Sequence, residues 1–260
     1  MFGKKGSSSL ILATTAVNAA LYMAVGVVSA PIPPVLGVRF WPPVFIPAVF
    51  AIMFGPWVGG VGAAIGIFLS DVFYGHGNAL LSLVVGVPSN FVGFYVLGWL
   101  TENMPKGPGR KLLTLLSILV SPLIFIAYFV SIYLTLGWGG FGLPQYVCVL
   151  VGIVVVAVVL IATRRKSAWS SFEIASPIGL ALGSLIIGVG LVAFSRLFTL
   201  PAVVGTSPLS IDVIYGATAF TYFSEILFML FLTPPIVAAV RAAFPSFRLG
   251  PRNSGTNDTK

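Results

Sequence analysis

The stretch from Arg39 to Asp71 constrains the fold more than any other part of the chain. Its only charges stand at its two ends, and everything between them is apolar or small. A proline-rich entry leads into an apolar run that stops at Gly55 and the proline after it, and a second apolar run rich in glycine follows. Because a Gly-Pro pair breaks a helix, whereas proline is tolerated in a first turn, the stretch predicts two short helices folded back on each other. Glycines four residues apart, such as Gly62 and Gly66, are typical of helices that pack closely in lipid.

The overall composition indicates a membrane protein. Hydrophobic residues make up 58% of the chain, charged residues 8%, and the mean hydropathy is +1.06. A soluble domain carries roughly a quarter charged residues. Several apolar runs reach the ~20 residues that a helix needs to cross the hydrocarbon core, and no segment shows the ten-residue alternation of an outer-membrane barrel. The sequence therefore predicts an all-α integral membrane protein.

We expect a polytopic bundle of about eight transmembrane helices in one domain, residues 1–243, followed by a polar tail, 244–260, that is disordered. A further break is expected where Pro234 and Pro235 stand near the end of the last helix. The expected helices are 10–29, 40–54, 56–73, 79–100, 111–136, 144–163, 177–200 and 208–240.

The basic residues predict the orientation of the bundle. If the N-terminus is inside, twelve of the fourteen Lys and Arg residues fall in inner segments, and only Arg39 and Arg196 fall outside. Under the positive-inside rule this places both termini in the cytoplasm and the chain in the cell membrane as a multi-pass protein. The net charge of +8 is explained by this orientation, so no nucleic-acid partner is implied. The first apolar run is long for a signal peptide and is interpreted as a retained helix.

The composition also excludes several kinds of active site. A single cysteine, Cys148, and a single histidine, His76, leave no disulfide and no multi-histidine metal site. No Walker loop, HExxH motif or matched serine–histidine arrangement is present. We therefore expect neither enzymatic activity nor a cofactor.

Residues at the two outer ends of the hairpin form one group of candidate binding residues. The ends of a hairpin lie close together, so a cation and an anion should converge on the same rim, near aromatic and hydrogen-bonding groups. The alternatives are an ion pair, ordinary interfacial anchors and a solvated loop histidine. The group consists of Arg39, Trp41, Asp71, Tyr74, His76 and Asn78.

Polar residues inside the apolar helices form a second group. Asn90 follows Pro88, and a proline kink there would present its amide to a cavity; an interhelical hydrogen bond is the alternative. Glu225, with Tyr222 beside it, lies near the middle of the last helix. An ionised carboxylate at this depth costs several kcal/mol without a partner, so it predicts a contact to substrate, a proton site or a structural hydrogen bond.

The first helix carries alanines on one face, at Ala16, Ala20 and Ala24. Small residues at this spacing allow another helix to approach closely in lipid. The face could pack against another helix of this chain or dock a partner protein.

Together, the alanine-spaced first helix, the proline-rich loop, the turn at Gly55 and the glycine-rich helix ending at Asp71 resemble the substrate-binding (S) components of energy-coupling factor (ECF) transporters. The resemblance covers about residues 10–100. These membrane subunits capture vitamins and related micronutrients for import.

The resemblance implies specific partners and roles. The face at Ala16, Ala20 and Ala24 would dock onto a transmembrane T component that two cytosolic ATPases drive, and the loop near Arg39 and Trp41 would gate the pocket. Family members usually have six helices, so the fold implied is a six-helix core with an extra pair, and the second half, 111–240, is divergent. The N-terminal histidine of nickel and cobalt members is missing, which favours an organic substrate. The alternative is a stand-alone permease, possibly proton-coupled through Glu225; a lipid-acting enzyme is disfavoured because no acid–base pair converges.

Overall fold

The computed structural model describes residues 8–29, 31–32, 34–75, 77–140, 142–164 and 169–244. In this part of the chain seven helices are long and apolar enough to cross a membrane, and no strand is formed. The predicted multi-pass helical architecture is therefore confirmed. The spanning segments are α1 (Ser8–Gly26) with η1 (Val27–Ser29), α3 (Pro56–Phe73), the composite α4 (Ala79–Leu81), η3 (Ser82–Gly86) and α5 (Val87–Glu102), then α6 (Pro108–Leu136), α7 (Leu143–Arg164), α8 (Ser170–Leu197) and α9 (Asp212–Ala243).

The helical hairpin is present, but its first arm is short. A 3₁₀ turn, η2 (Pro42–Val44), leads into α2 (Phe45–Phe54), which has only 10 residues. At 1.5 Å per residue α2 is about 15 Å long, roughly half the thickness of a hydrocarbon core. Gly55, with φ of 97°, makes the reversal into α3. Eight spanning helices were expected; among the described residues seven helices are long and apolar enough to span, and α2 is a short apolar helix buried in the bundle.

Three prolines that were expected to begin or break helices lie inside them. Pro177 is in the second turn of α8, which begins at Ser170, and α9 continues through Pro234 and Pro235. The predicted break in the last helix is wrong. Neighbouring helices and hydroxyl side chains make up for the backbone hydrogen bonds that proline removes from a membrane helix, so proline inside such a helix is tolerated.

A π-helical turn marks the middle of the fourth predicted helix. The turn η3 separates the single turn of α4 from α5, whose second residue is Pro88. Because Pro88 has no N–H, the pattern of backbone hydrogen bonds along the helix has to shift at this point. Turns of π-helix are frequent at functional sites. The turn re-aims the residues that follow it, including Asn90.

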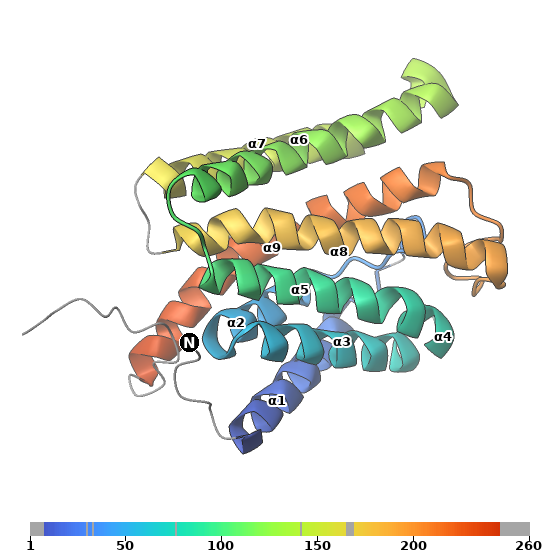
Figure 1. Cartoon of the computed structure of the whole chain (residues 1–260). Coiled ribbons are helices and arrows are strands. Elements are labelled where there is room, and N and C mark those ends of the chain that lie inside the picture. Colours follow the sequence, from blue (N-terminus) through green and yellow to red (C-terminus); the bar gives the residue numbers. More distant parts are fainter. Residues whose placement is uncertain are drawn as a thin grey trace, which may run out of the picture.

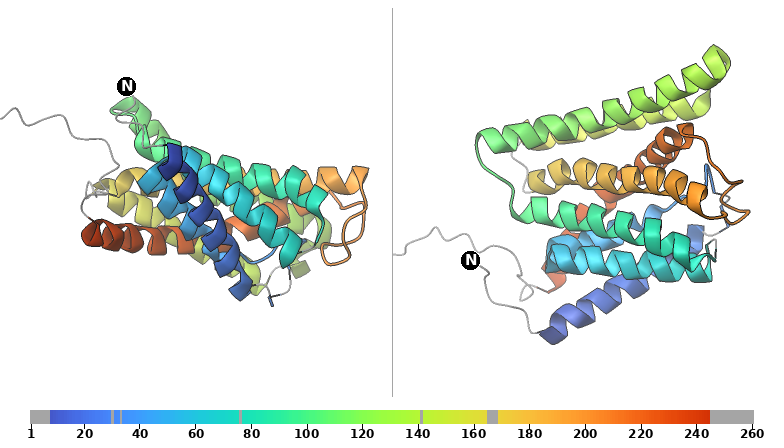
Figure 2. Two further views of the ribbon diagram at one scale, coloured as in Figure 1. Left: turned by 90° about the horizontal axis from the view of Figure 1, so that it is seen from below. Right: turned by 45° about the vertical axis from the view of Figure 1, so that its right-hand side comes forward.

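The helices form a tightly packed group with a pair attached to one side. The closest packing joins α5 to α8, α3 to α5, α1 to α3, and α8 to α9. Helices α6 and α7 lie side by side and pack on α8 and α9, at the opposite side of the bundle from α1 (Figures 1 and 2).

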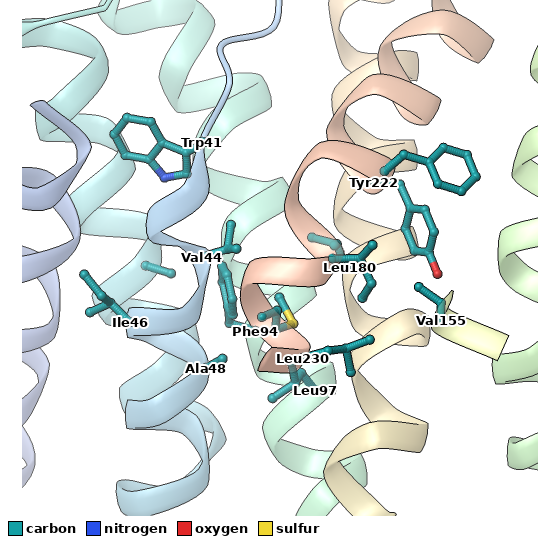
Figure 3. Close-up of a cluster of buried hydrophobic side chains, with 14 of the residues drawn as sticks. Trp41, Val44, Ile46, Ala48, Phe94, Leu97, Val155, Leu180, Tyr222 and Leu230 are labelled. Atoms are coloured by element: carbon teal, nitrogen blue, oxygen red, sulfur yellow. The ribbon is translucent and has the colours of Figure 1, made fainter. Parts of the chain in front are cut away.

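Glycines bring α5 and α8 into backbone contact. A Cβ atom at Gly179 would lie 2.7 Å from the carbonyl oxygen of Gly93, and one at Gly183 would lie 3.0 Å from that of Ser89. Next to this seam, Phe94 and Leu97 of α5 and Leu180 of α8 belong to the main hydrophobic core (Figure 3). The seam holds α5 and α8 together along one wall of the cavity described next.

Candidate substrate-binding site

A cavity of about 110 Å³ lies between α1, the loop of residues 37–41, α3, the composite helix α4–α5, α8 and α9. It is lined by no described residue of α6 or α7. The volume suits a small organic molecule or several waters. Its walls are predominantly apolar, with a few polar side chains converging from different helices, which is the usual character of a small-molecule site. The polar or charged lining residues are Tyr22, Arg39, Asp71, Ser89, Asn90, Ser184, Thr221 and Glu225.

An ion pair lines this cavity. The Arg39 guanidinium donates to Asp71 at 2.7 Å, with the two side chains 15% and 8% exposed. The other carboxylate oxygen of Asp71 accepts a hydrogen bond of 2.7 Å from Ser82. Within the loop, the guanidinium carbon of Arg39 lies 4.5 Å from the ring centre of Trp41. The loop before α2 is therefore tied to the end of α3 by charge and hydrogen bonds.

Tyr22 connects α1 to the opposite wall. Its side chain is completely buried, and its hydroxyl donates to Asn90 Oδ1 at 2.7 Å. The Asn90 amide in turn donates to the carbonyl of Gly86 at 3.0 Å. The Tyr22 ring meets Trp41 and Phe94 edge-to-face, with centroid distances of 5.6 and 6.0 Å. Three aromatic rings thus form one side of the cavity.

Glu225 enters the cavity from α9. The residue is only 6% exposed. Within the described part of the chain its carboxyl group has no hydrogen bond and no ion pair. It stands on the same face of α9 as Thr221 and Met229, which also line the cavity.

The structure brings together five of the nine side chains that the sequence suggested for a binding site. These are Arg39, Trp41, Asp71, Asn90 and Glu225, which all line the cavity.

The other four are placed differently or lie outside the described residues. Tyr74 is 45% exposed, and Asn78 caps α4 by accepting from the Leu81 amide at 2.9 Å. The hydroxyl of Tyr222 lies 2.8 Å from Ser121 Oγ of α6. Figure 3 shows the Tyr222 side chain directed toward Val155 of α7, away from Trp41. His76 lies outside the described residues.

Several lining residues were not singled out from the sequence. Tyr22 lies on the side of α1 away from the alanine face, and no spacing in the sequence marks it as a lining residue. The contribution of α8, which includes Gly183 and Ser184, carries only a weak signal, since small residues in a membrane helix usually indicate packing.

The alanine face of α1 does not pack against any other helix of the described chain. Ala16, Ala20 and Ala24 are all exposed, while α1 packs on α3 through its other side. There, Asn18 is fully buried and donates to the carbonyl of Val58 at 2.9 Å. Packing within the chain therefore does not explain the alanine spacing.

Within the described residues, no three His, Cys, Asp or Glu side chains approach closely enough to hold a metal ion. No protein-family model, no curated protein and no solved structure matches this chain. The cavity and its side chains are accordingly the basis for a functional proposal.

Proposed function

We propose that this protein is the substrate-capture subunit of an ECF-type, ATP-driven importer for a small organic micronutrient. The single observation that carries the proposal is the cavity, which Arg39 of the loop and Asp71 at the end of α3 line as an ion pair. The distribution of basic residues predicts that this end of α3 faces outward. A site that a loop residue and a helix end line on that side suits capture from outside, with opening of the loop as the gate.

The arrangement of the helices supports the same proposal. A six-helix core with an extra pair was expected from the resemblance. Here α1, α2, α3, α4–α5, α8 and α9 form the packed group, and α6 and α7 lie as a pair on one side of it (Figure 1). Neither this pair nor α2 lines the cavity. In this proposal the core is built from both ends of the chain, with the pair inserted between them.

The exposed alanine face of α1 supports a partner in the membrane. Alanine offers little apolar area to lipid compared with leucine, but it permits close helix–helix contact. In this proposal Ala16, Ala20 and Ala24 contact the transmembrane T component, which two cytosolic ATPases drive.

The experiment co-expresses the tagged chain with a T component and two ATPases from the same genome and measures what co-purifies. We expect a complex that Ala20→Trp disrupts. The matched control is Leu21→Trp, because Leu21 is 43% exposed on the same helix but points about 100° away from Ala20. Equal retention of the complex by both variants would contradict docking through the alanine face.

A stand-alone permease is the second candidate, and the buried carboxyl group of Glu225 is the observation that favours it. In a permease this group would exchange a proton for substrate. Purified protein in liposomes separates the two candidates. Uptake driven by a proton gradient without any ATPase, and lost in Glu225→Gln, would establish the permease and overturn the importer subunit.

A further inference from the structure

We infer that the substrate of this cavity is a small organic cation with an apolar or aromatic body, bound with its charged nitrogen against Glu225. The inference rests on the proposed capture function and adds the chemical class of the molecule that is captured. It is carried by the charges, the hydrogen bonds and the aromatic side chains of the cavity, taken in turn below.

Glu225 is a buried acid without a partner in the described part of the chain. The residue is only 6% exposed, and the carboxyl group of such a residue would normally be hydrogen-bonded or paired. Glu225 has neither kind of partner in the described part of the chain, and it faces the open volume. The missing partner therefore has to come from what occupies the cavity.

The charged side chains give the cavity a net charge when Glu225 is ionised. Three of them line it: Arg39, Asp71 and Glu225. The first two form an ion pair at 2.7 Å, and Ser82 occupies the remaining oxygen of Asp71. Their charges cancel, so an ionised Glu225 leaves the cavity with a net charge of −1. A cationic substrate neutralises this charge, whereas an anionic one would add to it.

Most side-chain hydrogen-bond donors of the cavity lining are already engaged. Tyr22 donates to Asn90, and the Asn90 amide donates to Gly86. The hydroxyl groups of Ser89, Ser184 and Thr221 donate to backbone carbonyls of their own helical segments. Arg39 Nη1 and Trp41 Nε1 have no hydrogen-bond partner, but protein atoms cover both nitrogens. The Glu225 carboxyl group, by contrast, can accept a hydrogen bond, which favours a substrate that donates one.

The walls of the cavity suit a substrate with an apolar or aromatic body. The aromatic rings of Tyr22, Trp41 and Phe94 form one wall, and aliphatic side chains from α3, α4, α8 and α9 form most of the rest. Aromatic faces stabilise cations as well as apolar groups. The cavity would therefore accommodate a molecule whose polar head lies against Glu225 and whose hydrophobic body lies along these walls.

The test measures binding of three probes of similar size to the purified protein by equilibrium dialysis at neutral pH. The probes are benzylammonium, benzyl alcohol and benzoate, which carry a positive charge, no charge and a negative charge. We expect the wild-type protein to prefer benzylammonium over both others by about 10-fold or more, the range of a charge-assisted hydrogen bond. Equal binding of the three, a preference for benzoate, or binding of none by the folded protein would overturn the inference.

A variant assigns the preference to one side chain. Glu225→Gln keeps the shape and hydrogen-bonding capacity but removes the charge, so we expect benzylammonium to bind roughly 10- to 100-fold more weakly and benzyl alcohol to bind about as before. The matched control is Glu102→Gln, an exposed acid at the end of α5 outside the cavity lining, which should leave all three affinities unchanged. If Glu225→Gln fails to fold, the wild-type preference among the three probes still decides the matter.

The result is independent of the proposed transport route. Loss of the cation preference with an intact complex of T component and ATPases would remove the substrate class and leave the capture subunit in place. Cation binding without any such complex would do the reverse, because the probes report only on the cavity.

Discussion

We expect the contributions of Arg39 and Asp71 to the free energy of unfolding to depend on each other, because the two residues form an ion pair. Its two charged groups are 2.7 Å apart and largely shielded from solvent. At an effective dielectric constant of about 20, Coulomb attraction at this distance amounts to roughly 6 kcal/mol, which the cost of desolvating both groups offsets in large part. What remains costly is the burial of one charge without the other.

A double-mutant cycle with Arg39→Met and Asp71→Asn measures this dependence. Each single change leaves one uncompensated group, so we expect each to lower the free energy of unfolding by about 3 kcal/mol. The double variant removes both charges and should lose about 3 kcal/mol rather than the roughly 6 kcal/mol of additive sites. The coupling energy is then about 3 kcal/mol, at the upper end for directly contacting residues.

The assay is reversible unfolding in mixed micelles as the fraction of denaturing detergent increases, followed by circular dichroism. Because the pair is largely buried, the coupling energy should change little between low and high salt, unlike that of a surface pair. If the losses of unfolding free energy in the two single variants add up to the loss in the double variant within ~0.5 kcal/mol, the reasoning is refuted. The loop would then be held by Trp41 and apolar packing alone.

Three further substitutions test particular contacts. Gly179→Ala should destabilise the protein by about 1–3 kcal/mol in the same assay, since its Cβ would meet a backbone oxygen of α5 at 2.7 Å, whereas Gly152→Ala, with nothing closer than 3.7 Å, should be nearly neutral; equal effects would contradict the close α5–α8 seam. Tyr222→Phe should cost about 1 kcal/mol through loss of the bond to Ser121 and leave benzylammonium affinity unchanged, and weaker binding would return Tyr222 to the site. Asn90→Ala, which removes the acceptor of the α1 tyrosine hydroxyl, should lower both stability and probe affinity, and a change in stability alone would indicate a purely structural amide.

Hydropathy predicted the helices well because the membrane leaves the backbone few choices. An apolar segment in lipid must satisfy its own N–H and C=O groups, so apolar runs become helices almost regardless of local propensity. The bounds expected for 56–73 and 144–163 accordingly agree with α3 and α7 to within a residue. The same reason explains the failure at Pro234 and Pro235. Proline was interpreted as it would be in water, where the chain can leave the helix because water satisfies its backbone groups.

The outer rim was predicted in part. Convergence of Arg39 and Asp71 followed from the hairpin alone, because a reversal at Gly55 returns the chain to the same side, and the ion pair confirms it. Tyr74 and Asn78 come after the end of α3, where side-chain direction depends on the local turn. The Asn78 side chain caps α4. Asparagine directly before a helix is a preferred N-cap, so its position in the sequence indicated this role at least as strongly as a binding role.

The face of α9 that meets the cavity was predicted only at Glu225, and the rest of that face could not be read from the sequence. This helix is apolar on all sides, so no periodic contrast marks an inner stripe. In the structure Thr221, Glu225 and Met229 line the cavity at intervals of four, and Tyr222 is turned about 100° away from Thr221 toward α6. The pair α6–α7 therefore affects the site without touching it. Ser121 of α6 engages the Tyr222 hydroxyl. The polar side chains that α9 contributes to the cavity are Thr221, which donates to its own helix, and Glu225, which has no hydrogen bond or ion pair in the described part of the chain.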